Sequence, residues 1–412
     1  MTAEHAVTPR VGLAEVRAAR DVLSGVVETT PVVISRALSQ LCAGPVWFKC
    51  ENLQRTGSFK IRGAYTRLHR LDPEQRARGV VTASAGNHAQ GVALAAQMLG
   101  ISATVFMPRT AALPKVAATR SYGAEVRLVG DTVEACLLAA AEMTERTGAV
   151  LIHPFDHPDV IAGQGTVGVE IVEQVPDVRT VLVPVGGGGL IGGVAAAVKG
   201  LTRNVSVVGV QVEGAAAWPA SLAAGAPVTL DRVHTIADGL AVARPGDVTF
   251  PQIASLVDTF VTVDDDAVSR ALLHCLERAK LLVEPAGAAP VAALLEQPDR
   301  FAPPVVAVLS GGNIDPLVLV HLVQHGLTAA GRYLSLQVRM QDRPGALARL
   351  LTLIGAQGAN VLDVSHSRVS RALPLGDVDV AITLETRGPD HSREVVAAVR
   401  AAGHIVNVTS GG

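Results

Sequence analysis

Lysine is scarce in this sequence, which narrows the search for covalent chemistry. A lysine amine can form an imine with a carbonyl compound or with pyridoxal phosphate, and arginine cannot replace it in that role. The chain has five lysines: Lys49, Lys60, Lys115, Lys199 and Lys280. Each of them is therefore a candidate for covalent catalysis and has to be compared with an ordinary structural explanation.

Four of the lysines have simple structural explanations. Lys199 and Lys280 end helical patterns, where a cation suits the negative end of the helix dipole. Lys115 follows Leu-Pro at an exposed helix start, and Lys49 lies in an alternating strand, where we expect its side chain to point outward. Lys60 differs because it opens a helix in TGSFKIRGAY, where its amine can be partly desolvated and held in place. An ordinary surface lysine in a first helical turn is the alternative.

A glycine run is the second candidate site. PVGGGGLIGG (184–193) follows an apolar β-run and opens a helix, a geometry in which backbone N–H groups hold a phosphate. The run also contains G-x-G-x-x-G at Gly187, Gly189 and Gly192, with Glu213 beyond the next strand, which resembles a dinucleotide fingerprint. Four consecutive glycines favour a compact monophosphate site, and an NAD(P)-dependent oxidoreductase is the alternative. A flexible linker is disfavoured, because apolar strand and helix patterns flank the run.

The elements that position these residues follow an alternating pattern. From about residue 46 to 312, Val-rich runs alternate with helical patterns, which predicts parallel sheets covered by helices. We expect strands at 46–51, 80–84, 103–107, 125–130, 150–154, 180–186, 205–211 and 305–312. This number favours two adjoining α/β lobes over one small sheet. Ligands bind at the carboxyl ends of such strands, so the turns SAGNH, GGGGL and GGN are where we expect the chemistry.

The pattern changes after Gly326, where LTAAGR leads into a strongly alternating strand. The expected order is strand 333–340, helix 345–357, strand 360–368, strand 377–385, helix 391–402 and strand 404–408. This βαββαβ order is the split ferredoxin-like unit. It has no nucleophile–base pair or carboxylate pair, so we interpret it as a binding or regulatory module. The expected domains are a catalytic domain at 1–326, a linker at 327–331 and a regulatory domain at 332–412.

Six motifs together closely resemble one enzyme family. They are TGSFKIRGA (56–64), SAGNHAQG (84–91), GGGGL (186–190), ADGLAV (237–242), EPAGA (284–288) and SGGN (310–313). Their order resembles that of the fold type II pyridoxal-phosphate enzymes, in particular the threonine/serine dehydratases and their racemase relatives, over about residues 10 to 325. DRPGALARL and GANVLDV resemble the ACT domain, an amino-acid-sensing module of threonine ammonia-lyases. The resemblance implies a two-lobed α/β catalytic fold, similar to tryptophan synthase β, followed by a ferredoxin-like ACT domain.

The resemblance assigns residues around a pyridoxal phosphate cofactor. It makes Lys60 the Schiff-base lysine, Phe59 the packing partner of the ring, Asn87 the donor to the 3-oxygen, and Ser310 the partner of the pyridine nitrogen. Gly239 and Glu284 would border the ring and the docking face. The phosphate would be held by backbone amides of Gly186, Gly187, Gly188, Gly189 and Leu190. The substrate carboxylate would be received by the loop Ser84, Ala85, Gly86, Asn87 and His88. Ser84 is expected to be a catalytic residue together with Lys60.

These assignments predict elimination. A hydroxyl at the ring nitrogen, here Ser310, cannot stabilise a pyridinium charge, so the ring withdraws fewer electrons and loss of a β-substituent is favoured over transamination. The freed amine of Lys60 would remove the Cα proton as a general base. Threonine would give 2-oxobutanoate and ammonia, and serine would give pyruvate. The one methyl group by which threonine exceeds serine contributes only about 1 to 3 kcal/mol to discrimination in a pocket. The sequence therefore does not decide whether threonine or serine is the preferred substrate.

Departures from the relatives refine this expectation. Racemases carry a second serine where this chain has Ala85, so we expect poor racemisation, and a serine racemase-like enzyme is the alternative. Cysteine and threonine synthases continue the lysine motif as Lys-Asp-Arg, whereas Ile61 and Arg62 follow here, which favours the dehydratases. Glu213 could supply one ligand of a divalent cation site, but GAAAWP offers no second carboxylate. We therefore expect no divalent metal, and a monovalent cation remains open.

Composition excludes several other classes. The 35 Lys and Arg residues nearly balance the 37 Asp and Glu residues, which argues against nucleic-acid binding. No stretch of 18 apolar residues predicts a membrane span, and the first ten residues lack a signal-peptide pattern, so we expect a cytoplasmic protein. The four cysteines lack ligand-like spacing and are expected to be buried thiols. His153 and His157, next to prolines, are expected to be loop histidines and not metal ligands.

The ACT-like module predicts partners. It implies a homo-oligomer, a dimer or a tetramer, and an amino-acid effector such as isoleucine or valine, with a coupling of about 1 to 3 kcal/mol. The expected effector residues are Asp342, Pro344, Gly345, Ala346 and Asn360. A threonine dehydratase with such a module would serve isoleucine biosynthesis or threonine catabolism. A non-catalytic amino-acid sensor driven by this module is the alternative from another class.

Overall fold

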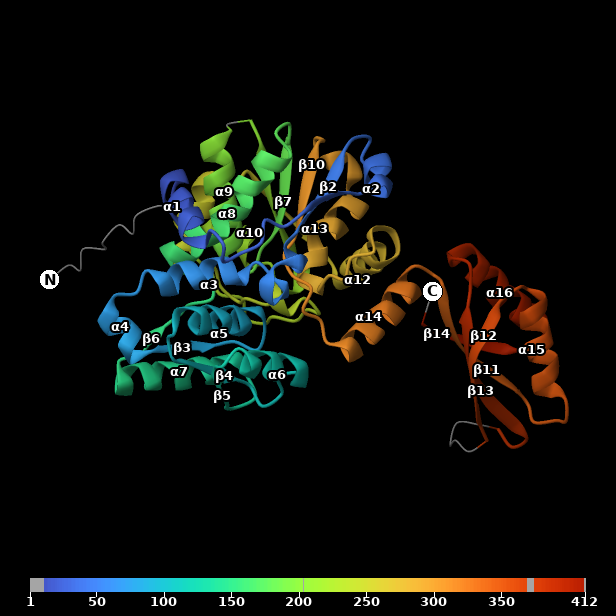
Figure 1. The fold of residues 1–412 in the computed structure, drawn as a ribbon. Coiled ribbons are helices and arrows are strands. Elements are labelled where there is room, and N and C mark those ends of the chain that lie inside the picture. The colour runs from blue at the N-terminus through green and yellow to red at the C-terminus, as the bar shows by residue number, and fades with distance from the viewer. Residues whose placement is uncertain (1–10, 203, 369–373, 411–412) are drawn as a thin grey trace. The chain divides into compact units, whose positions relative to one another are not determined.

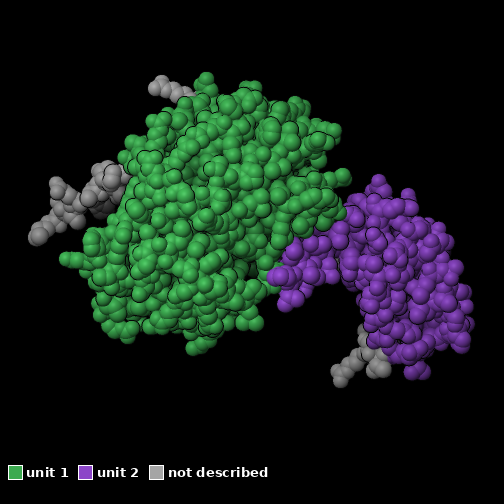
Figure 2. Space-filling view, in the orientation of Figure 1, with its two compact units in different colours: residues 1–315 green, residues 316–412 purple. Residues whose placement is uncertain are grey.

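The computed structural model describes residues 11–202, 204–368 and 374–410. The chain divides between Asp315 and Pro316 into two units, which Figure 2 shows in different colours. The expected boundary at residue 326 falls later in the chain. The difference arises because helix α14 (Pro316–Ala329) contacts strand β11 (Tyr333–Gln341) and so groups with the second unit.

The larger sheet of the first unit has six strands in the order β1-β2-β10-β7-β8-β9. Their bounds are β1 (Val32–Ile34), β2 (Val46–Cys50), β10 (Val305–Leu309), β7 (Thr180–Pro184), β8 (Ser206–Val212) and β9 (Thr259–Val263). Only β1 is antiparallel to its neighbour. Figure 1 shows helices on both sides of this sheet, which explains why its central strands are nearly continuous runs of buried valine, leucine and alanine.

A second, four-stranded parallel sheet forms the other lobe of this unit, in the order β5-β4-β3-β6. Its strands are β5 (Glu125–Leu128), β4 (Ala103–Met107), β3 (Val80–Ala83) and β6 (Val150–Leu151). The two sheets have separate apolar cores. The prediction of two α/β lobes is therefore confirmed. The sequence analysis missed β1 and β9, which are short strands at the two edges of the larger sheet.

Helices of the first unit start at two kinds of position. Asp72 and Asp264 accept first-turn N–H groups and cap the helices that follow them, as their residue type favours. By contrast, α3, α5 and α9 begin at the motif turns without a side-chain cap. At the start of α3 the N–H groups of Arg62 and Gly63 are engaged within the protein, whereas the starts of α5 and α9 leave first-turn N–H groups available to a ligand. The helices are α1 (Leu13–Leu23), α2 (Arg36–Leu41), α3 (Lys60–His69), α4 (Pro73–Arg78), α5 (Asn87–Leu99), α6 (Leu113–Ser121), α7 (Val133–Thr147), α8 (Pro158–Gln174), α9 (Gly189–Leu201), α10 (Ala217–Ala224), α11 (Thr249–Leu256), α12 (Asp265–His274) and α13 (Pro285–Glu296).

The second unit has the predicted βαββαβ order after α14. Its elements are β11, α15 (Ala346–Ala356), β12 (Asn360–Ser367), β13 (Asp377–Glu385), α16 (Pro389–Ala401) and β14 (Ile405–Ser410). The antiparallel sheet has the order β12-β13-β11-β14, and alternate residues of β11 and β13 are buried with residues of α15 and α16 in one core. The ferredoxin-like prediction is confirmed. Within the described residues, no helix is both long enough and apolar enough to cross a membrane.

Candidate active site

The three motif turns lie where parallel strands end and helices begin. The turn SAGNH joins β3 to α5, GGGGL joins β7 to α9, and SGGN follows β10. Lys60 is the first residue of α3, and the N–H of its neighbour Phe59 donates to the carbonyl of Ser310 at 3.2 Å. The lysine motif is thus joined directly to the SGGN turn, as the sequence analysis expected of a shared site.

The Lys60 amine is held at a defined point. Its Nζ donates to the carbonyl oxygen of Pro154 at 2.9 Å and lies 5.2 Å from the centre of the Phe59 ring. A Cβ at Gly91 of α5 would lie 3.1 Å from the carbonyl carbon of Lys60, so glycine at this position lets α5 pack closely against the start of α3. The amine is therefore positioned both by its own helix and by the helix that follows the SAGNH turn.

Two groups of the site, Lys60 and Glu284, have pKa values that are shifted toward neutral pH. Burial lowers the pKa of Lys60 from 10.5 to about 8, and the nearby Glu284 partly opposes this shift. Burial also raises the pKa of Glu284 to about 7, against the effects of Lys115 and of the hydrogen bond from Asn87. A base and an acid with such pKa values can exchange protons near pH 7, and such perturbed groups are typical of catalytic sites.

Asn87 links three of the motifs. Its Nδ2 donates to Oε1 of Glu284 at 2.7 Å, and its Oδ1 accepts from Nδ2 of Asn313 at 2.9 Å. The amide has a second N–H, which remains for a further acceptor such as the predicted ring oxygen. Asn313, the last residue of SGGN, was not singled out from the sequence, although its place in the motif is a signal that could have identified it.

The predicted carboxylate loop forms the start of α5. The Ser84 hydroxyl accepts from the N–H of Gly86 at 3.2 Å, and Gly86 caps α5 without a side-chain bond, which leaves a helix N-terminus suited to an anion. His88 is buried instead and its Nε2 lies 2.9 Å from the carbonyl oxygen of Ile152. Burial lowers the pKa of His88 to about 3, so the ring is neutral. His88 therefore anchors the segment before Pro154 and does not supply a positive charge.

The glycine turn fits a phosphate. Gly188 has φ +101° and precedes α9, so the loop enters the helix in a conformation that favours glycine. Among the described residues, the N–H groups of 186–189 donate no hydrogen bond, and residues 187–190 are buried. A Cβ on Gly186 would lie 3.0 Å from the carbonyl oxygen of Gly239, and one on Gly239 would lie 3.9 Å from Oε1 of Glu284. Buried, unpaired amides at a helix start are what a phosphate group requires, and Lys60, Asn87 and Ser310 complete a set of residues that fits pyridoxal phosphate.

Phe155, which the sequence analysis missed, lies beside the glycine turn. Its side chain stands beside the loop, so that a Cβ on Gly187 would lie 2.3 Å from the ring and one on Gly189 would lie 2.9 Å from its Cβ. Phe155 follows Pro154, which accepts the hydrogen bond from Lys60. The segment after β6 thus contacts both the amine and the glycine turn.

The expectation that Lys49 points outward is wrong. Lys49 is fully buried, and its Nζ contacts Oε2 of Glu170 at 2.5 Å and the carbonyl oxygen of Thr30 at 2.7 Å. The cause is α8, which carries Glu170 to this strand, so both faces of β2 are covered. Desolvation lowers the pKa of Lys49, although the nearby carboxylates oppose the shift.

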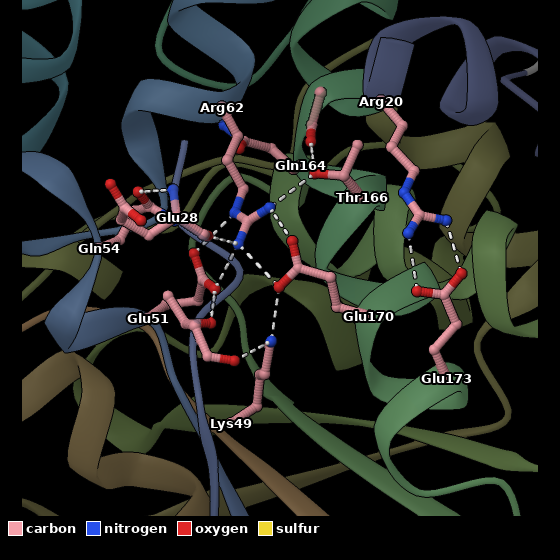
Figure 3. A network of polar contacts seen from close by, with 12 residues as sticks. Arg20, Glu28, Lys49, Glu51, Gln54, Arg62, Gln164, Thr166, Glu170 and Glu173 are labelled. Carbon is pink, nitrogen blue, oxygen red and sulfur yellow. Dashed lines mark hydrogen bonds and ion pairs between the residues drawn. The ribbon is translucent and has the colours of Figure 1, made fainter. Parts of the chain in front are cut away.

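Lys49 belongs to a buried charge network beside the start of α3 (Figure 3). Arg62, two residues after Lys60, contacts Oε2 of Glu51 at 2.8 Å and Oε1 of Glu170 at 2.6 Å, and it is fully buried. The network thus contains two cations and two carboxylates. It fixes the first turn of α3, and therefore the backbone from which Lys60 extends.

Replacement of Arg62 by methionine should destabilise the fold strongly. The change leaves Glu51 and Glu170 buried with Lys49 as the only cation of the network, and breaking a buried pair typically costs about 3 to 5 kcal/mol. Thermal or urea denaturation measures the effect. The matched control is Arg20→Met, which removes the half-exposed Arg20–Glu173 pair and should cost less than about 1 kcal/mol. Equal losses in both variants would contradict the importance of the network.

The other polar groups considered as metal ligands have structural partners. Nδ1 of His153 accepts the N–H groups of Phe155 and Asp156, and His157 caps α8 by accepting from the N–H of Asp159. In the part of the chain that the structure describes, no group of three or more histidine, cysteine or carboxylate residues is placed to hold a metal ion. The four cysteines are free and buried, which confirms their prediction as buried thiols.

The second unit has a cavity of about 540 Å³ at the turn before α15. Asp342, Pro344, Gly345 and Ala346, four of the five residues predicted for an effector site, line it. Asn360 does not line this cavity, and its Nδ2 lies 3.4 Å from Oε2 of Glu385. His366 and Arg368 are among the further lining residues that the sequence analysis missed, and the Arg368 guanidinium pairs with Asp342 at 2.8 Å.

Comparison with known proteins gives matches for both units. A family model described as pyridoxal-phosphate dependent enzyme matches residues 23–311, and a model of the ACT domain matches residues 334–404. An L-threonine ammonia-lyase of Thermotoga maritima is 46% identical over 398 residues, covering 97% of this chain and 99% of that protein. An L-threonine ammonia-lyase of Geobacter sulfurreducens is 47% identical over 394 residues, covering 95% and 98%.

Solved structures agree with these matches. A threonine deaminase from tomato, Solanum lycopersicum, has 38% sequence identity and a TM-score of 0.73, and the match covers 79% of this chain and 92% of that chain. A serine racemase from maize has 39% identity and a TM-score of 0.73, with 76% and 97% covered. The region matched by the family model contains Lys60, Asn87, the glycine turn and Ser310, so the geometry described above can be interpreted with this family's chemistry.

Proposed function

The chain belongs to the family of pyridoxal-phosphate dependent enzymes, and on this premise we propose that it is a threonine ammonia-lyase regulated through its C-terminal ACT domain. It removes ammonia from L-threonine to give 2-oxobutanoate, and it converts L-serine to pyruvate. The observation that carries the proposal is the half-buried Lys60 amine, which is held by the carbonyl oxygen of Pro154, while the next residue, Phe155, contacts a glycine turn with unpaired amides. Relatives named L-threonine ammonia-lyase, 46% and 47% identical over nearly the whole chain, support the choice of substrate.

The site residues have separate tasks. The cofactor, when bound, supplies an electron sink for the negative charge that develops at Cα. Lys60 holds the cofactor and then, as a neutral amine, accepts the Cα proton. The N-terminus of α5, with the loop from Ser84 to Asn87, orients the substrate carboxylate, while Asn87 and the glycine turn hold the ring and the phosphate. The bond between Cβ and the hydroxyl group then breaks, so that the Cα proton and the hydroxyl group together leave the substrate as the elements of water. Hydrolysis of the released enamine then consumes one water and gives the 2-oxo acid and ammonia.

Ser310 supports elimination over transamination. Its side chain is buried at the end of β10, and its carbonyl oxygen accepts the N–H of Phe59, so the residue lies beside the lysine motif. A ring whose nitrogen faces a neutral hydroxyl withdraws fewer electrons from Cα than a ring with a protonated nitrogen would. The electron pair from Cα is therefore used to expel the β-hydroxyl group.

Serine racemisation is the second candidate activity, because serine racemases are among the similar structures. Racemisation needs an acid or base on the opposite face of Cα, and Ala85 has no hydroxyl to provide one. We therefore expect pyruvate to exceed D-serine among the products from L-serine. Measuring D-serine by a chiral assay and pyruvate in the same reaction distinguishes racemisation from elimination.

The direct test is to measure 2-oxo acid release from L-threonine and L-serine side by side, with and without isoleucine and valine. The proposal expects release from threonine that depends on added pyridoxal phosphate. Saturable amino-acid binding without release of either 2-oxo acid would overturn it and would favour a sensor. Inhibition by isoleucine would indicate a biosynthetic role, and its absence a catabolic one.

We place the effector in the cavity of the ACT domain. Asp342 and Arg368 offer opposite charges there, which suit the amino and carboxylate groups of a free amino acid. In Arg368→Met, the effector concentration for half-maximal response should rise about tenfold or more, because charge-assisted hydrogen bonds contribute roughly 1.5 to 3 kcal/mol. The matched control is Asn360→Ala, outside the cavity, which should keep the response. An unchanged response in Arg368→Met would place the effector elsewhere.

We also propose a homo-oligomer, a dimer or a tetramer, in the cytoplasm. In the four-stranded sheet of the second unit, β12 and β14 are edge strands, and an open edge can pair with another copy of the chain. The four buried, free cysteines suit a reducing compartment. Light scattering after size exclusion measures the oligomeric state, and a monomer would contradict the proposal.

A further inference from the structure

The four carbonyl groups of residues 185–188, which lead into the glycine turn, each accept a hydrogen bond. The oxygen of Val185 accepts from Nε2 of Gln211 at 3.3 Å, and the oxygen of Gly186 accepts from Nε1 of Trp218 at 2.8 Å. The oxygen of Gly187 accepts from Oγ1 of Thr249 at 2.7 Å, and the oxygen of Gly188 accepts from the N–H of Gly192 at 2.9 Å. Three of these four donors are side chains from outside the turn, and none of the three belongs to a motif of the sequence analysis.

These bonds fix the direction of the amides as well. A trans peptide is planar, so the N–H of one residue points opposite to the carbonyl of the residue before it. Because each carbonyl of 185–188 points toward its own donor, the N–H of the next residue, from 186 to 189, points away from that donor. Within the described residues these four N–H groups donate no hydrogen bond, and successive free amides form an anion site.

We propose that Gln211, Trp218 and Thr249 are positioning residues that set the affinity of the glycine turn for the phosphate of the cofactor. They do not touch the phosphate. They act by holding the carbonyl oxygens away from it, so that four successive N–H groups face it before it binds. The inference rests on the proposed function only in taking pyridoxal phosphate as the ligand.

The Trp218 donor is itself rigidly held. The ring is fully buried and stacks on Phe250 and Phe260, with ring centres 6.1 and 5.8 Å apart. The backbone N–H of Trp218 donates to Oε1 of Gln211 at 3.0 Å, which joins two of the three positioning residues. A Cβ on Gly188 would lie 2.7 Å from the Trp218 ring, so the ring also fills the space behind the turn.

The Thr249 donor is held in place by the carboxylate of Asp156. Thr249 begins α11, and the carboxylate of Asp156 accepts the N–H groups of Asp247, Val248 and Thr249 at 2.9 to 3.0 Å. This carboxylate fixes the helix start from which the hydroxyl reaches Gly187. Trp218 and Thr249 thus hold the two central carbonyls through different contacts, although Phe250 of α11 also stacks on Trp218, and each of the two side chains can be replaced alone.

The test compares two ligands that differ only in the phosphate. The protein freed of cofactor is titrated with pyridoxal phosphate and with pyridoxal, and binding is followed by the visible absorbance of the lysine-bound chromophore. In Thr249→Val and in Trp218→Phe, the Kd for pyridoxal phosphate should rise roughly fivefold, since a hydrogen bond contributes about 1 kcal/mol and 1.4 kcal/mol is tenfold. The Kd for pyridoxal should stay within about twofold of wild type.

Two control variants separate positioning from general damage. Thr249→Ser keeps the hydroxyl and should bind both ligands as wild type does. Phe260→Leu removes a ring that stacks on Trp218 but no donor to the turn; it should lower the thermal midpoint and leave the ratio of the two Kd values unchanged. If Trp218→Phe does not fold, the pair Thr249→Val and Thr249→Ser decides the question.

Two results would overturn the inference: equal losses of affinity for both ligands in Thr249→Val, or no loss for either. A phosphorus NMR shift of the bound phosphate that is identical in wild type and Thr249→Val would also count against it. These outcomes are distinct from failure of the proposed function. If the wild-type protein binds pyridoxal phosphate but does not turn over threonine, the proposed function fails and the positioning role is still measured.

Discussion

Replacement of Lys60 by alanine should reduce turnover of threonine by at least about a thousandfold. Lys60 is expected both to hold the cofactor and to accept the Cα proton, and loss of a general base alone typically costs about 10² to 10⁴ in rate. The variant should also lose the visible absorbance of the lysine-bound cofactor. Both quantities are measured on the same preparation, by 2-oxo acid release and by the absorption spectrum.

Two further variants, one at Lys60 itself and one at Lys280, serve as controls. Lys60→Arg keeps the positive charge but cannot form an imine, so it should be as inactive as the alanine variant. Lys280→Asn changes an exposed lysine with φ +59°, a conformation that asparagine tolerates, and should remain active. Covalent capture of the cofactor by borohydride in Lys60→Ala would contradict the assignment, because another lysine would then hold it.

The parts of the site that could be predicted are those with a local signature. Lys60 at a helix start, the turn containing Asn87 and the glycine run are each short segments whose residue types determine their backbone shape. Because such turns follow parallel strands, they meet at the carboxyl ends of the sheets, and the bond between Phe59 and Ser310 agrees with this expectation.

The misses have a common physical cause, which is long-range packing. Lys49 lies in an alternating strand, and alternation predicts an outward side chain only when one face of the sheet meets water. Here Glu170 of α8 reaches the strand from 121 residues away in the sequence. Thr249 and Gly187, a donor and its acceptor, are 62 residues apart. No local pattern around Thr249, in TFPQI, indicates that its hydroxyl bonds to the glycine turn.

Attachment of the cofactor should follow a pH curve set by the lowered pKa of Lys60. An imine forms from the neutral amine, and burial lowers the pKa of this amine from 10.5 to about 8. The rate of attachment should therefore rise with pH and level off above about 8. At pH 7 the neutral fraction of Lys60 should be roughly 300 times that of an ordinary lysine. Stopped-flow absorbance after mixing the cofactor-free protein with pyridoxal phosphate gives the curve.

Glu284 provides the internal check on this curve. The carboxylate favours the charged amine and so raises the pKa of Lys60, against the larger effect of burial. Glu284→Gln should therefore move the midpoint of the curve to lower pH, since the charged amine loses its stabilising partner. Glu173→Gln changes a half-exposed carboxylate paired with Arg20 and should leave the midpoint in place. A wild-type midpoint near 10.5, or a shift to higher pH in Glu284→Gln, would show that burial does not control this amine.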